Sequence, residues 1–185
     1  SPPYPLRNPR AYGNPDLSEY VEWVVSTIEP IARNLRDGGS ICLNVTNDAF
    51  EPGTPARSLY RERLILEMAE RLDLWKMDEI IWHNPQKPPT PTEWVSKTRQ
   101  QLKAGYEAIL WFTNNPQAVE ADNRRVLDPH TDRMKTLIGK GGEARHRQSS
   151  DDAYRCRPGS FGNETPGRIP QNVLKMGHSC GSQNR

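Results

Sequence analysis

Apolar residues recur along this chain at two different spacings, and the alternation of these spacings is the feature that most constrains the fold. Residues 17–35 have the three- and four-residue spacing of an amphipathic helix, for which Asp16 and Glu19 predict a capping box and Pro30 predicts a kink or a break. Residues 40–45 form a short β-branched run, which is typical of a buried parallel strand.

The alternation then repeats. A second helix is predicted over residues 55–72, with Thr54 as its cap and a proline in its first turn. Residues 75–82 and 106–112 predict two further strands. Helices that alternate with strands in this way indicate the α/β class.

The hydrophobic pattern fades after the last of these strands. Gly, Arg, Ser and Asp dominate there, and residues 131–138 predict the one clear helix. We therefore expect a first domain over residues 1–113 and a loop-rich region over residues 114–185.

Composition limits the class of protein. The chain is polar, with a mean hydropathy of -0.85, and it contains no apolar run as long as a membrane span, which predicts a soluble intracellular protein with no membrane partner. A net charge of +2 permits an anionic partner without requiring one. The three cysteines and four histidines are scattered, which predicts neither a metal site nor a disulfide framework.

The first four residues, Ser1-Pro2-Pro3-Tyr4, have a composition that points to chemistry. Two consecutive prolines fix two φ angles and remove two backbone N–H donors, so the carbonyls beside them are free to accept hydrogen bonds. Ser1 adds a hydroxyl acceptor, and Tyr4 adds a flat ring that can stack on a planar ligand. Ser1 Oγ and the Pro2 carbonyl would localise the lone pair of an exocyclic amine as it attacks an electrophile.

Cationic side chains gather in two later stretches. The long loop after the second predicted strand carries Lys87, Lys97 and Arg99, which are candidates to bind phosphates, and Trp82 at its start offers a stacking surface. A basic tract in the second region includes Arg145 and Arg147. Both stretches predict contact with nucleic acid.

Seven blocks of the sequence, in their order and spacing, resemble the class-beta amino-methyltransferases of DNA. The resemblance is to the cytosine-N4 type, whose catalytic tetrapeptide is Ser-Pro-Pro-Tyr or Ser-Pro-Pro-Phe. The blocks are SPPYPLRNPRAYGN, EYVEWVVSTIEPIARNLRDGGSICLNV, PARSLYRERLILEMAERLDL, IIWHNPQKPPTPTEWVSK, AILWF, DPHTDRMKTLI and RIPQNVL.

The resemblance implies a fold and an activity. The fold would be half of a Rossmann-like methyltransferase sheet with an irregular target-recognition region, to which Arg168 would belong. The activity would be the transfer of a methyl group from S-adenosylmethionine to N4 of a cytosine flipped out of double-stranded DNA. A cognate restriction endonuclease and the cytoplasm of a bacterium, with the gene bacterial or phage-borne, are the implied partner and location.

The same resemblance implies roles for individual residues. Ser1, Pro2, Pro3 and Tyr4 would be catalytic, and Asn44, Trp82 and Asn84 would lie at the pocket for the target base. The family resemblance also implies Asp where this chain has Asn44, and an amide cannot accept a proton at neutral pH. Asn44 would then only orient the base, or the proton of the amine would leave directly to solvent.

One expected part is missing from the sequence. The Phe-x-Gly-x-Gly turn that binds S-adenosylmethionine in such enzymes does not occur in the chain. In this permuted family the turn would follow residue 185, and the strand that leads into Ser1 would precede the chain. We expect the segment by itself to transfer no methyl group.

Two alternatives stay open on the sequence. The first is adenine-N6 transfer with the same architecture, because related families with other tetrapeptides modify adenine. The second is a catalytically inactive DNA-binding module. The recognised DNA sequence and the oligomeric state do not follow from the residues.

Overall fold

The computed structural model describes residues 2–5, 13, 15–151 and 153–177. Contacts divide the chain into two compact units, Ser1–Glu120 with Asn172–Arg185, and Ala121–Gln171. The division begins close to the expected one at residue 114, but the last residues return to the first unit. As a division by function, the expected boundary stays a prediction.

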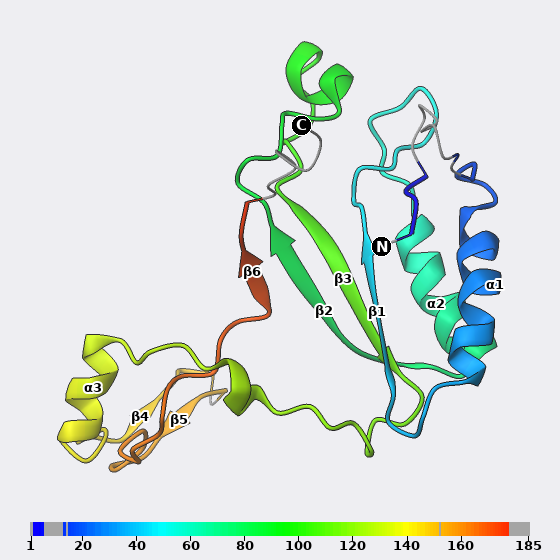
Figure 1. Cartoon of the computed structure of the whole chain (residues 1–185). Helices are drawn as coiled ribbons and strands as arrows, with labels where there is room; N and C mark the ends of the chain where they lie inside the picture. Colours follow the sequence, from blue (N-terminus) through cyan, green and yellow to red (C-terminus); the bar gives the residue numbers. More distant parts are fainter. Residues whose placement is uncertain (1, 6–12, 14, 152, 178–185) are drawn as a thin grey trace, which may run out of the picture. The chain divides into compact units, whose positions relative to one another are not determined.

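The first unit is built on a four-stranded mixed sheet in the order β1-β3-β2-β6 (Figure 1). The strands are β1 Ser40–Val45, β2 Trp75–His83, β3 Tyr106–Thr113 and β6 Val173–Lys175. Both β1 and β2 pair antiparallel with β3, and β6 adds to β2 in parallel. The predicted α/β class and the three predicted strands are confirmed.

The predicted parallel pairing of residues 40–45 is wrong, because the neighbour of β1 is the antiparallel β3. Burial along β1 alternates, with Ile41, Leu43 and Val45 buried and the residues between them less so. A short β-branched run indicates that a strand is buried, but it does not indicate whether the neighbouring strand is parallel or antiparallel. That direction is decided by β3, which inserts between β1 and β2.

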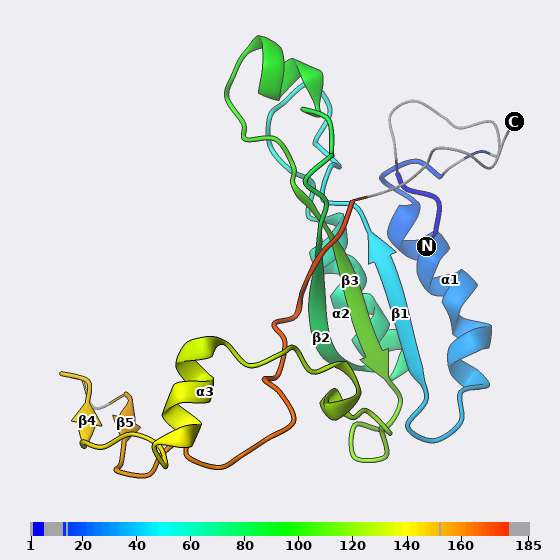
Figure 2. The same ribbon diagram turned by 60° about the vertical axis from the view of Figure 1, so that its left-hand side comes forward.

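Two helices, α1 Tyr20–Arg33 and α2 Tyr60–Leu72, lie together on one side of the sheet (Figures 1 and 2). The hydrophobic core forms where this helical layer packs against the buried side chains that alternate along the strands. The rings of Tyr20 and Tyr60 meet edge to face at 5.3 Å within it. Other fully buried side chains include Val24, Val25, Leu64, Met68, Leu110 and Phe112.

Both helices begin later than predicted. The capping box at Asp16 and Glu19 is wrong: α1 begins at Tyr20, the Glu19 side chain makes no capping hydrogen bond, and the Glu19 N–H donates to the Asp16 carbonyl in a preceding turn. The helix runs through Pro30 without a break and ends at Arg33.

The start of α2 moves from residue 55 to Tyr60 because the residues before it pair with the chain that leaves β1. The Ser58 N–H donates to the Ala49 carbonyl at 2.9 Å, and Phe50 and Arg57 form an isolated bridge. Thr54 accepts a hydrogen bond from the Ala56 N–H at 3.1 Å, so it closes a loop turn instead of a helix.

The second unit contains little regular structure, as the fading hydrophobic pattern predicted. A 3-10 turn, Asn123–Val126, precedes α3 Asp132–Gly139, for which Thr131 accepts a capping hydrogen bond from the Met134 N–H. Two short strands, β4 Arg147–Gln148 and β5 Arg155–Cys156, pair antiparallel. None of the described helices is long and apolar enough to cross a membrane.

Candidate functional site

Three polar side chains from distant parts of the sequence meet at the end of β1. Tyr4 donates its hydroxyl hydrogen to Glu107 Oε2 at 2.7 Å. Asn44 Nδ2 lies 3.0 Å from the Tyr4 hydroxyl and 3.0 Å from Glu107 Oε2. We refer to Tyr4, Asn44 and Glu107 as the polar triad. It ties Tyr4, the last residue of the Ser-Pro-Pro-Tyr segment, to the sheet.

The pleat of the sheet explains why Asn44 and Glu107 meet. Asn44 is opposite Ile109 in the antiparallel pairing of β1 with β3, and Glu107 lies two residues before Ile109. Residues two apart on a strand share a face, so Asn44 and Glu107 are diagonal neighbours. Leu43 and Val45 point to the opposite face, into the core.

A chain of charges continues from the polar triad. Lys87 Nζ lies 3.4 Å from Glu107 Oε1 and 3.0 Å from Asp48 Oδ2. Arg57 lies 3.6 Å from Asp48 and stacks over the Phe50 ring at 4.8 Å. The Lys87, Asp48 and Glu107 side chains are only 13%, 15% and 16% exposed, so these charges interact in a partly desolvated environment.

A buried tyrosine, Tyr60, holds the segment that follows β1 in place through a hydrogen bond. The Tyr60 hydroxyl donates to the Thr46 carbonyl, and burial raises the pKa of Tyr60 above its ordinary value. Tyr60 therefore stays a neutral donor at physiological pH. Asn47 Nδ2 donates to the Tyr106 hydroxyl at 2.9 Å, which ties the same segment to the start of β3.

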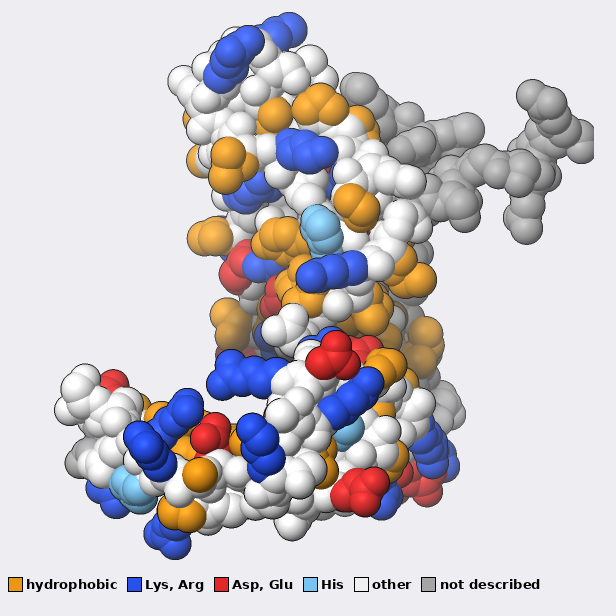
Figure 3. All heavy atoms as spheres, turned by 90° about the vertical axis from the view of Figure 1, so that its left-hand side faces the viewer, with side chains coloured by type: hydrophobic (Ala, Val, Ile, Leu, Met, Phe, Trp, Pro, Cys, Tyr) orange, Lys and Arg blue, Asp and Glu red, His pale blue; other side chains and the backbone are white. Residues whose placement is uncertain are grey.

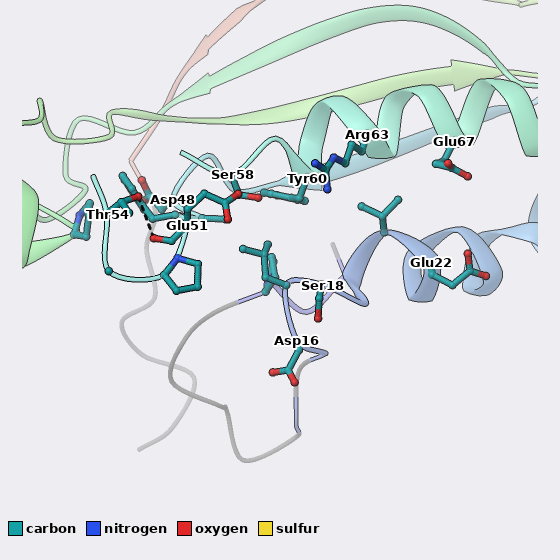
Figure 4. Close-up of a pocket in the computed structure, with 18 of the residues that line it drawn as sticks. Asp16, Ser18, Glu22, Asp48, Glu51, Thr54, Ser58, Tyr60, Arg63 and Glu67 are labelled. Atoms are coloured by element: carbon teal, nitrogen blue, oxygen red, sulfur yellow. Dashed lines mark hydrogen bonds between the residues drawn. The ribbon is translucent and has the colours of Figure 1, made fainter. Parts of the chain in front are cut away.

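A cavity of about 1210 Å³ opens beside this segment, between the loop after β1 and the starts of α1 and α2 (Figure 4). Pro5, which follows Tyr4, is part of its wall, and Asp48 belongs both to the wall and to the charge chain. Seven carboxylates and two arginines line it, so it is poorly suited to phosphate. The carboxylates are Asp16, Glu22, Asp48, Glu51, Glu67, Glu70 and Glu93.

The predicted pocket residues occupy different settings. Asn44 belongs to the polar triad, and Trp82 is opposite Glu107 in the pairing of β2 with β3. Trp82 Nε1 donates to the Met176 carbonyl at 3.0 Å, and Asn84 Oδ1 accepts from the Gln86 N–H at 3.0 Å. A role of Trp82 and Asn84 at a base pocket stays a prediction. Ser1 lies outside the described residues.

The predicted DNA-binding cations are also placed differently from one another. Lys87 is held between two carboxylates inside the site, whereas Lys97 pairs with Glu93 at 2.8 Å on the surface of the loop. Arg99 and Arg145 are exposed. Arg147 lies 3.6 Å from Glu143, and Arg168 lies 3.0 Å from Asp128. Their contact with DNA stays a prediction.

The second unit carries a small excess of cationic residues. Residues 121–171 contain ten Lys and Arg residues and seven Asp and Glu residues, while the remaining residues are balanced to within one charge. Figure 3 shows Lys and Arg side chains exposed on the surface. A local excess of cations favours a phosphate backbone.

Glu107 and the role of Lys87 inside the site are the features that the sequence did not predict. The signal for Glu107 is a carboxylate at the start of an otherwise apolar strand, Tyr106–Thr113. Lys87 was assigned to phosphate because its loop is basic. Its two carboxylate partners are 39 and 20 residues away in sequence, and only the fold brings them together.

Comparison with known proteins identifies the family. Residues 1–176 match the family described as DNA methylase (N6_N4_Mtase). The chain is 32% identical over 182 residues to the type II methyltransferase M.PvuII of Proteus hauseri, a match that covers 97% of this chain and 52% of that protein. The chain therefore spans about half the length of this relative.

A solved structure has the same fold. The PvuII DNA methyltransferase, described as cytosine-N4-specific, aligns with 99% of this chain and 50% of its own at a TM-score of 0.66 and 24% identity. The expected half of a Rossmann-like methyltransferase sheet is thereby confirmed. On the match over residues 1–176, the chain belongs to the DNA methylase family of N6 and N4 enzymes.

Proposed function

We propose that the protein carrying this chain is a site-specific DNA methyltransferase that methylates N4 of cytosine. The observation that carries the proposal is the anchoring of the Ser-Pro-Pro-Tyr segment to the sheet through Tyr4, Asn44 and Glu107. Membership of the DNA methylase family and the likeness to M.PvuII support it. Double-stranded DNA is the proposed substrate, and the bacterial cytoplasm is the proposed location.

In the proposed mechanism a cytosine leaves the DNA stack and enters the site beside Tyr4. Its amino group is held by Ser1 Oγ and the Pro2 carbonyl, which accept its two hydrogens and localise the nitrogen lone pair. The Tyr4 ring stacks on the base, and the hydrogen bond from Tyr4 to Glu107 fixes the orientation of that ring.

The proposed cofactor is S-adenosylmethionine, which supplies an electrophilic methyl group. The glycine-rich turn expected to hold it does not occur in this sequence, and we assign no residue of the chain to that task. The contribution proposed for this chain is to bind the base, to orient its amino group and to exclude water. A cognate restriction endonuclease is a further proposed partner.

Mass spectrometry of nucleosides tests the proposal. The complete coding sequence that includes this chain would be expressed in a bacterial host without DNA methylation, and genomic DNA would be digested to nucleosides. We expect N4-methylcytosine, and its loss in the Ser1→Ala variant. N6-methyladenine in its place would reject the choice of cytosine. The absence of any methylated nucleoside, with DNA binding kept, would favour an inactive DNA-binding module.

A further inference from the structure

The Glu107 carboxylate is the centre of the hydrogen bonds around Tyr4. One of its oxygens, Oε2, accepts from the Tyr4 hydroxyl at 2.7 Å and from Asn44 Nδ2 at 3.0 Å. The other oxygen, Oε1, faces Lys87 Nζ at 3.4 Å. The two oxygens thus serve different groups, and both are partly withdrawn from water because the side chain is 16% exposed.

An ionised carboxylate can only accept hydrogen bonds, so Glu107 decides the direction of every bond in the polar triad. The amide atom of Asn44 that faces Glu107 must be the NH₂ group. The Tyr4 hydroxyl must donate to Glu107, which leaves its lone pair to accept from Asn44. If the Asn44 amide were flipped, its oxygen would face the Glu107 carboxylate, which has no hydrogen to donate.

The consequence appears on the other side of the Asn44 amide. Asn44 Oδ1 is buried and has no hydrogen-bond partner among the described residues. A buried unpaired acceptor is costly, so this orientation of the amide must be imposed by the hydrogen bonds on its NH₂ side. Glu107 and Tyr4 supply those hydrogen bonds.

We propose that Glu107 is a positioning residue of the methyl-transfer site: it fixes the Tyr4 ring and holds the Asn44 amide in a single orientation beside that ring. The inference rests on the proposed function for its substrate. Lys87 pairs with the other oxygen of Glu107, so both oxygens of the carboxylate face donors.

The Glu107→Gln variant tests the inference at constant size. Glutamine has one acceptor oxygen and one NH₂ group, so it cannot accept from Tyr4 and Asn44 and also face Lys87 with an oxygen. In the complete protein we expect kcat for methyl transfer to fall about 10- to 100-fold through loss of orientation. KM for DNA should stay within about twofold, because the contacts to the phosphate backbone are unchanged.

Glu79→Gln is the matched control. Glu79 lies on β2, is 24% exposed and pairs with Arg61 at 3.2 Å and Lys76 at 3.4 Å, so it is also a partly buried, ion-paired carboxylate of the sheet. These two cations lie outside the polar triad, and the substitution should leave kcat within about twofold of the original. Equal losses in the two variants would overturn a specific role for Glu107.

Exchange of the two groups gives a rescue test. Asn44→Asp combined with Glu107→Gln again places one carboxylate beside one amide, with their strands interchanged. We expect kcat of the double variant to exceed that of Glu107→Gln by about tenfold, as coupled neighbours do. Asn44→Asp alone should lower kcat, because it places two carboxylates side by side and they repel each other. A double variant no better than Glu107→Gln would overturn the inference.

A spectroscopic measurement separates this inference from the proposed function. In protein labelled at tyrosine and asparagine, the ring signals of Tyr4 and the side-chain amide signals of Asn44 should shift in Glu107→Gln and stay in place in Glu79→Gln. Unchanged signals would reject the positioning role even if methyl transfer were normal. If the original protein methylated no base, the proposed function would fail while these signals still reported on Glu107.

Discussion

Two carboxylates and two cations neutralise one another in this site. Lys87 lies between Asp48 and Glu107, and Arg57 approaches Asp48 from the other side. Because the three side chains in the centre are less than one fifth exposed, the removal of one charge is not compensated by water.

Replacement of Lys87 by Met should therefore destabilise the first unit. Asp48 and Glu107 would remain partly buried without their nearest cation, at a cost of about 1–3 kcal/mol in the free energy of unfolding at neutral pH. Urea denaturation at neutral pH should show this loss.

Lys76→Met provides the comparison for Lys87→Met. Lys76 pairs with Glu79 at 3.4 Å, but its side chain is 35% exposed. Solvent screens such a pair, so the expected loss is less than about 1 kcal/mol. A Lys87→Met deficit that was equally small would show that the charge chain does not stabilise the fold.

Elements differ in how far the sequence predicts them. The strands β1, β2 and β3 appear where apolar β-branched and aromatic runs predicted them, because burial itself selects those residues. The start of α2 was missed because residues 55–59 are held by pairing with the chain after β1, a contact that helix spacing does not report.

The residues of the site also differ in whether the sequence predicted them. Tyr4 was predicted from the tetrapeptide, and Asn44 was predicted from the family resemblance. Glu107 was not, because it reaches Asn44 only through the register of an antiparallel pair 63 residues apart in sequence. The sequence predicted a parallel neighbour for β1, and with that pairing the diagonal contact would not exist.

The turn between α1 and β1 requires a glycine for two separate reasons. Gly38 has φ +68, and a Cβ atom on it would lie 2.1 Å from the Ala118 carbonyl oxygen. Gly53 has a similar φ of +72, with no atom within 4 Å of such a Cβ. Comparison of alanine variants at Gly38 and Gly53 therefore separates the cost of positive φ from the cost of steric overlap.

Gly38→Ala should cost more than Gly53→Ala. Alanine at positive φ costs about 1 kcal/mol at either position, and only Gly38→Ala also forces the segment at Ala118 away. We expect the difference in the free energy of unfolding between the two variants to exceed about 1 kcal/mol, as measured by urea denaturation. Equal costs would mean that the segment near Ala118 yields without penalty.

For the molecule as a whole, the two units differ in the balance of charge and in the amount of regular structure. The first unit has a buried core and the polar triad, and the second is loop-rich with an excess of cations. If the protein binds DNA as proposed, phosphate contacts from the second unit contribute affinity that depends on salt, whereas the polar triad acts on the base.

Substitution of Arg145 and Arg147 by Ala tests this division of labour. Removal of one cation that binds a phosphate should reduce the slope of log K against log salt by about 1, so we expect the slope of the double variant to fall by about 1–2. Arg147 pairs with Glu143 only at 3.6 Å, and Arg145 is exposed, so the fold should tolerate both changes.

The control is Arg33→Ala with Arg36→Ala, two exposed cations of the first unit, which should leave the slope unchanged. Equal slopes for all three proteins would place the phosphate contacts elsewhere, because counterion release depends on how many phosphates are neutralised and not on the base sequence.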